Sequence, residues 1–284
     1  MEFKGYSLVQ IFKQYKAKVS FTFFLLVLEN GFKVIQPFVL GLAINDLLEK
    51  TYDGLILFAI LYLISFFIGI FRRYFDTRVY TKIYSDLATS LSKQQFKHHV
   101  SISSISARSS LVKELIDFFE QDLPQAFAAI IQVIGSVVML YLFDGWVFLA
   151  CLVSILLIYI IYAFSSSTIY KYNTGFNDEY EKRLDILKTK DVKQVRLHFN
   201  SISDWMIKLS NLEVVNFGII EFILLALSIF TLVLASQIPN VSPGEIFSIM
   251  TYVLEFSQGV FLLPFLYQQV IRLKEISERL KTIS

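Results

Sequence analysis

The chain has 284 residues, of which 55% are hydrophobic, 16% aromatic and 18% charged. Soluble domains average about half apolar and about a quarter charged residues, and a mean hydropathy of +0.57 excludes a water-soluble globule. The net charge of only +2 argues against a nucleic-acid binder. The single cysteine, Cys151, excludes an intrachain disulfide and any multi-cysteine metal site.

The chain opens with a short amphipathic segment and continues in long apolar stretches. Residues 1–18 carry apolar and basic residues on opposite faces, which predicts a helix lying on the membrane surface. A bilayer-spanning helix needs about 20 apolar residues, and six stretches approach or exceed that length. The predicted spans cover about 19–44, 54–71, 125–143, 145–170, 214–236 and 246–271. We therefore expect an all-α integral membrane protein with one transmembrane domain over 1–284.

The distribution of basic residues orients these spans. With both termini in the cytoplasm, the four inner segments, 1–18, 72–113, 171–208 and 272–284, hold 24 of the 26 Lys and Arg residues. Cytoplasmic segments are enriched in Lys and Arg, so the count predicts a multi-pass protein of the cell (inner) membrane with both termini inside. The outer loops are very short, whereas the two inner connections are long and helical in pattern, which predicts long cytoplasmic helical extensions.

Turn signals place bends in the inner connections. The serines of 101–106 favour a bend, and Asp122 followed by Pro124 predicts the start of a new helical segment. The second inner bend is expected near 191–199. His198 is interpreted as a solvated histidine, and no metal site is predicted.

Polar residues inside the spans are the candidate site. Glu29, Lys33 and Gln36 share one face of the first span, and Glu255 and Gln258 share one face of the sixth. Because intramembrane ionisable groups usually face a cavity or a partner, these residues predict a midplane cavity that binds substrate or carries protons. Glu221 is a weaker candidate, near the inner edge of the fifth span.

Structural alternatives remain open for the same residues. Glu29 and Lys33 stand in the favourable order for an internal ion pair. Glu255 could be a neutral acid that is hydrogen-bonded to a neighbouring helix. Arg72, Arg73 and Arg78 follow the second span and are interpreted as positive-inside anchors, with the binding of anionic substrates as the alternative.

One local pattern carries a family resemblance. Residues 242–247 (S-P-G-E-I-F), with Tyr252, Pro264 and residues 277–280 (S-E-R-L), resemble the T-P-G-E-L…Y…P…S-x-R-I pattern of ABC exporters. Asn45–Leu47 (N-D-L) is similar to the I-D-x-L that ends their first span. The span order also resembles the ABC exporter transmembrane domain, which implies a domain-swapped homodimer or heterodimer. In that fold, spans four and five pack on the partner.

The resemblance implies a transporter subunit that works by alternating access. The sequence ends where the linker to an ATPase domain would begin, and it contains no Gly-Lys-Ser or Gly-Lys-Thr. We therefore expect no enzymatic activity and no cofactor in this chain, with ATP hydrolysed by a separate nucleotide-binding subunit. Two alternatives stand beside this function: a proton-coupled secondary transporter on the same fold, and a non-transporting membrane scaffold or regulatory protein.

The resemblance also implies that an ATPase would dock at the inner bends. By their position in the topology, Ile102, Ile105 and Phe199 are the candidate coupling residues. Packing within the bundle is the alternative role for all three.

Overall fold

The computed structural model describes residues 13–97 and 102–281, and within them every side chain except those of 103–104, 107–108 and 263–281. All regular structure in these ranges is helical. The chain divides into two compact units, one formed by residues 1–143 with 235–284 and the other by 144–234. The surface helix predicted over 1–18 falls mostly outside the described residues.

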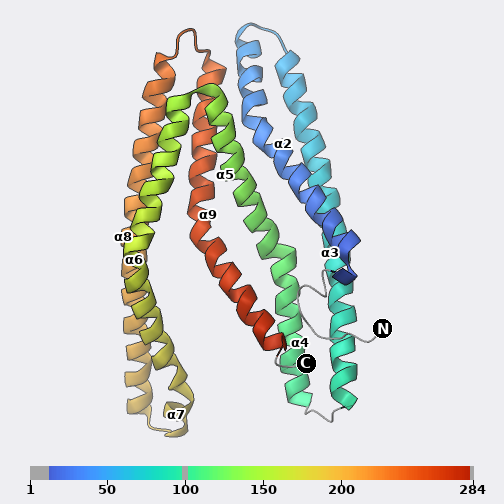
Figure 1. The fold of residues 1–284 in the computed structure, drawn as a ribbon, viewed down its shortest axis with the longest axis vertical. Coiled ribbons are helices and arrows are strands. Elements are labelled where there is room, and N and C mark those ends of the chain that lie inside the picture. Colours follow the sequence, from blue (N-terminus) through green and yellow to red (C-terminus); the bar gives the residue numbers. More distant parts are fainter. Residues whose placement is uncertain (1–12, 98–101, 282–284) are drawn as a thin grey trace. The chain divides into compact units, whose positions relative to one another are not determined.

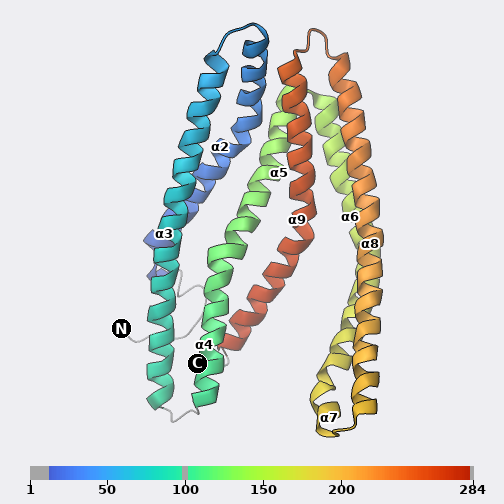
Figure 2. The same ribbon diagram turned by 180° about the vertical axis from the view of Figure 1, so that it is seen from behind.

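The first unit is a bundle of long helices. It contains α2 (Lys16–Leu48), α3 (Asp53–Lys97), α4 (Ile102–Asp117), the π-helical turn η1 (Phe118–Asp122), α5 (Leu123–Phe143) and α9 (Pro243–Lys281). In Figure 1 and from behind in Figure 2, α2 runs beside α3 and α5 runs beside α9. Helix α2 also contacts α5 and α9, so four helices surround a common interior.

An apolar core joins the N-terminal end of α2 to the C-terminal half of α3 and to α4. Its centre consists of fully buried side chains on α3 and α4, among them Tyr80, Ile83, Leu87, Val112 and Leu115. Tyr15 ties the entry of α2 to this core, because its hydroxyl donates to Asp86 Oδ2 at 2.8 Å. Burial and this carboxylate raise the pKa of Tyr15 to about 12, so the hydroxyl keeps its proton and the bond at neutral pH.

At the opposite end, α2 and α9 approach so closely that only small residues fit. A Cβ added to Gly244 would lie 1.9 Å from the Gly41 carbonyl oxygen. Asn45 bridges the two helices, since its Nδ2 donates to Ser242 Oγ and its Oδ1 accepts from Gly244 N, both at 2.8 Å. Ser242 and Glu245 cap the start of α9 reciprocally. The S-P-G-E pattern and Asn45 therefore form one helix junction.

The helical segment predicted to start at Asp122 and Pro124 is α5, which begins at Leu123. Helices α4, η1 and α5 run without interruption from Ile102 to Phe143. Pro124 lacks an N–H and cannot make the usual helical hydrogen bond. The π-turn accommodates it, because the Leu123 N–H donates to the Phe118 carbonyl across a wider turn. Residues 102–106 are helical and belong to α4, so the bend predicted over 101–106 does not lie in them.

The second unit is a helical hairpin of α6 (Gly145–Glu181) and α8 (Val192–Gln237), with the short α7 (Arg183–Lys188) between them. Trp205 fills the space between the long helices, because it packs on Tyr172 and over Gly175, where a Cβ would lie 2.6 Å from its ring. The hairpin turn occupies 182–191, with Lys190 in the left-handed region (φ 54°). The second bend thus precedes the expected 191–199, and Phe199 lies two turns inside α8.

Five helical stretches within the described residues are long and apolar enough to cross a membrane. They are Lys16–Leu48, Asp53–Lys97, Ser109–Phe143, Gly145–Lys188 and Val192–Gln237. These stretches make the chain a multi-pass membrane protein. The sixth predicted span lies within α9, whose described side chains end at residue 262, and it stays a prediction. At 1.5 Å per residue the 45 residues of α3 extend about 68 Å, well beyond the roughly 30 Å of hydrocarbon.

Candidate functional site

A cavity of about 600 Å³ lies within the first unit, between α2, α3, α5 and α9. Glu29, Lys33, Gln36 and Glu255 all line it, although Glu255 comes more than 200 residues later in the chain than the other three. The sequence analysis grouped these four residues, and in the structure all four line the same cavity. Their role in transport stays a prediction.

The structure does not bring the other two predicted residues to this cavity. Gln258 is exposed on α9 and does not line the cavity. Glu221 belongs to α8 of the second unit, where its side chain is exposed. The helical spacing that grouped Gln258 with Glu255 was too coarse, because three residues along a helix rotate a side chain by about 60°.

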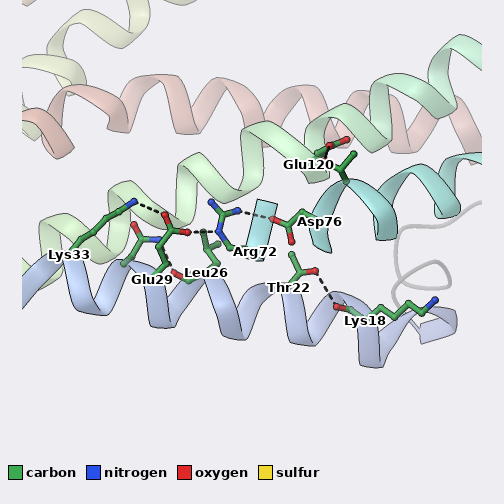
Figure 3. A network of polar contacts seen from close by, with 10 residues as sticks. Lys18, Thr22, Leu26, Glu29, Lys33, Arg72, Asp76 and Glu120 are labelled. Atoms are coloured by element: carbon green, nitrogen blue, oxygen red, sulfur yellow. Dashed lines mark hydrogen bonds and ion pairs between the residues drawn. The ribbon is translucent and has the colours of Figure 1, made fainter. Parts of the chain in front are cut away.

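A chain of ion pairs joins α2 to α3 beside the cavity (Figure 3). Glu29 accepts from Lys33 Nζ at 2.7 Å and from Arg72 Nε at 2.5 Å, one bond to each carboxylate oxygen. Arg72 then donates through Nη1 to Asp76 Oδ2 at 2.7 Å. The pair of Glu29 with Lys33 that sequence spacing allowed is therefore present.

Arg72 is the central residue of this network, and its interpretation as a surface anchor is wrong. Its side chain is 12% exposed, and those of Glu29 and Asp76 are 4% exposed. The planar guanidinium can serve two carboxylates in fixed directions, which a lysine ammonium cannot do in the same way. Two acids and two bases make the network formally neutral, which lowers the cost of burying each charge.

The only signal in the sequence for this role was the i, i+4 spacing of Arg72 and Asp76. That spacing could not reveal that the pair faces Glu29 on another helix. Gly69, one turn before Arg73, lets α3 come close to Glu29 on α2. A Cβ at this position would already lie 3.1 Å from Glu29 Oε1. The network is thus decided by how α3 packs on α2.

A second hollow of about 420 Å³ shares part of this lining. It adds Arg72, Asp76, Thr77 and Glu120, so that it is strongly polar. Glu120 comes from the π-turn and accepts from the Thr77 hydroxyl at 3.2 Å. The wider turn η1 therefore presents a carboxylate toward α3, next to the ion-pair network.

A model of the ABC transporter transmembrane region matches residues 8–244. The match covers most of the chain and includes α2 to α8 together with the start of α9. The chain belongs to the ABC transporter transmembrane region family. No curated protein sequence matches it at a significant level.

The family assignment confirms the resemblance found in the sequence and identifies the chain as a transporter membrane domain. Most of the S-P-G-E…Y…P pattern in α9 lies beyond residue 244, so that this match did not depend on it. The first residues of the pattern have a structural role, because they form the junction between α2 and α9 of this membrane domain.

The candidate coupling residues of this membrane domain differ in exposure. Ile102 starts α4 and is 82% exposed, and Phe199 is also exposed on α8. Ile105 is buried, so it packs within the structure. Helix α7, at the tip of the hairpin, was not among the predicted contact points; it has no buried residue.

His198 is buried, which contradicts its interpretation as a solvated histidine. Its Nδ1 lies 2.8 Å from Glu179 Oε1 across the hairpin of α6 and α8, and its Nε2 has no hydrogen-bond partner among the described residues. Lys182 and His198 both donate to Glu179, and these bonds lower the pKa of that carboxyl below 4.5. No cluster of three or more metal-ligating side chains occurs in the part of the chain that the structure describes.

Proposed function

We propose that this chain is the membrane subunit of a transporter that moves a solute by alternating access. The observation that carries the proposal is the polar cavity of about 600 Å³ enclosed by α2, α3, α5 and α9 in a chain of the ABC transmembrane family. A bilayer-spanning bundle gains nothing in stability from such a space, because its polar lining is costly in the membrane. A solute that exchanges between two sides of a membrane needs it.

The working form of the transporter is a homodimer or a heterodimer with a similar chain. The division of the chain into two compact units supports this, since the hairpin of α6 and α8 is a separate unit that a partner can receive. Both termini and the long helical extensions lie in the cytoplasm at the cell (inner) membrane, as the excess of Lys and Arg in those segments supports.

ATP hydrolysis by a separate subunit drives the transport cycle. The 284 residues contain no P-loop, so the chain itself is not an enzyme and binds no nucleotide by that motif. The ATPase docks at the inner bends, where Ile102 and α7 offer exposed side chains. Ile105 contributes by positioning the start of α4 from inside the bundle.

One observation favours a proton-coupled mechanism as the second candidate. Glu255 lines the cavity, and no hydrogen bond or ion pair of its side chain occurs among the described residues. A carboxylate that is free of a structural partner can take up and release a proton during a transport cycle.

Thiol labelling of the cavity tests alternating access. Gln132→Cys is made in a Cys151→Ser background, because Gln132 lines the cavity and Cys151 is the only native cysteine. We expect a membrane-impermeant maleimide to label it from the cytoplasmic side in one state and from the outer side in another. Ile134→Cys, on the exposed face of the same helix, is the matched control, whose labelling should not change.

The driver of the change separates the candidates. ATP with a copurified ATPase changes the labelled side in the first mechanism, and an imposed pH gradient on the isolated chain changes it in the second. Labelling from one side under every condition would contradict transport and favour a scaffold.

A further inference from the structure

Two charged side chains line the cavity of the first unit without a partner among the described residues. Glu29, Lys33 and Arg72 neutralise one another in the network beside it. Glu255 on α9 and Arg73 on α3 line the same cavity, and none of the ion pairs or hydrogen bonds of the described residues involves either of them. The cavity therefore offers one carboxylate and one guanidinium to whatever enters it.

The two charges stand at different depths. Helix α9 runs antiparallel to α2, since the Ser248 hydroxyl donates to the Pro37 carbonyl and the Tyr252 hydroxyl to the Val34 carbonyl. Continuing that register places Glu255 beside about residue 31 of α2. Gly69 lies against Glu29, so Arg73 stands one turn further, beside about residue 25. Six residues at 1.5 Å each separate the backbone positions of Glu255 and Arg73 by roughly 9 Å along the bundle.

The cavity also has an apolar stripe along α3. Tyr62, Phe66 and Ile70 follow one another at intervals of four residues on α3, so they form one stripe that faces the cavity. Amide side chains stand opposite, from Asn30 on α2 and Gln132 on α5. A bound molecule would meet an apolar surface along one side and hydrogen-bonding groups along the other.

We propose that the cavity binds a zwitterionic amphiphile whose ammonium pairs with Glu255 and whose anionic group pairs with Arg73, the two being joined by an apolar body about as long as a tripeptide. This names the substrate class of the proposed transporter and rests on that function. An extended tripeptide spans about 10 Å, which is close to the separation of the two backbone positions along the bundle. A free amino acid is too short, and so is a phosphatidylethanolamine headgroup, where two carbons join amine and phosphate.

Calorimetric titration tests the proposal with three probes. The full chain in phosphatidylcholine nanodiscs is titrated with trileucine, with N-acetyl-trileucine, which lacks the ammonium, and with trileucine amide, which lacks the carboxylate. A charge-assisted contact contributes about tenfold in Kd or more. We expect trileucine to bind about tenfold or more tightly than either blocked form.

Two variants assign each charge to its partner. Glu255→Gln should weaken trileucine and its amide by about tenfold and leave N-acetyl-trileucine unchanged. Arg73→Gln should weaken trileucine and its N-acetyl form and leave the amide unchanged. Glu221→Gln and Arg78→Gln remove charges that do not line the cavity, and they should leave all three Kd values unchanged. The blocked probes report on the unaltered chain, so the test does not depend on whether a variant folds.

The outcomes separate the substrate class from the transport function. Equal binding of the three probes, or no binding of trileucine, would overturn the zwitterion proposal, and transport could still be seen by cavity labelling. Exchanging phosphatidylcholine for phosphatidylethanolamine should leave the Kd of trileucine unchanged. Competition by that lipid would overturn the length argument, because the short headgroup would then be the occupant.

Discussion

Replacing Arg72 by glutamine should destabilise the first unit strongly. Arg72 holds Glu29 on α2 at 2.5 Å and Asp76 on its own helix at 2.7 Å, and all three side chains are mostly buried. Removing one partner from a buried ion pair leaves an uncompensated charge and costs about 3–5 kcal/mol. For a chain of this size, 1 kcal/mol corresponds to a shift of about 2–4 °C in Tm, so we expect a fall of roughly 6–20 °C.

The assay is the temperature at which half of a fluorescent-protein fusion leaves the monodisperse size-exclusion peak. Arg72→Lys should give an intermediate loss, because one ammonium cannot serve both carboxylates in the geometry of the guanidinium. Lys113→Gln breaks the exposed pair with Asp117 and should shift Tm by less than about 2 °C.

A neutralised network separates lost charge balance from lost packing. The triple variant of Arg72→Gln with Glu29→Gln and Asp76→Asn leaves no buried charge unpaired, so it should recover most of the lost Tm. If Arg72→Gln unfolds within about 2 °C of the unaltered chain, or if the triple variant is no better than the single one, the network does not hold α2 to α3 as described.

Three further predictions concern other contacts. Gly244→Ala should lower Tm through a clash with the Gly41 carbonyl that costs about 1–3 kcal/mol, whereas Gly31→Ala, with open space around it, should be neutral or slightly stabilising in the same assay. Asn45→Ala removes both hydrogen bonds from α2 to the start of α9 and should cost about 1–3 kcal/mol, and an unchanged Tm would contradict this junction. The pKa of Glu179 is lowered in the folded hairpin, so its stabilising contribution is complete above pH 4.5 and disappears as the pH falls through the folded-state value. Glu179→Gln should therefore speed hydrogen exchange at the tip of α6 and α8 at pH 7 and match the unaltered chain at about pH 3, and equal exchange at pH 7 would sink the assignment.

Hydropathy and charge determined the membrane class of this protein. Long uncharged stretches are stable as helices in the bilayer, so the five spanning helices followed from composition alone. The excess of Lys and Arg on one side predicted their orientation. The resemblance carried by S-P-G-E and the order of spans predicted the family correctly. The same reasoning predicted that Glu29 and Glu255 share one cavity, because an ionisable side chain inside a span is costly to expose to lipid. Both residues line the cavity in the structure.

Tertiary structure alone decided which charged groups are paired with one another and which line the cavity without a partner among the described residues. Arg72 and Arg73 are neighbours in sequence and look equivalent there, but a helix turns by about 100° per residue, so one points into a buried network and the other into the open cavity. In the same way, His198 is buried only because α8 folds back on α6 and presents Glu179 to it. A sequence records which side chains are available, and the packing of one helix on another fixes which of them meet.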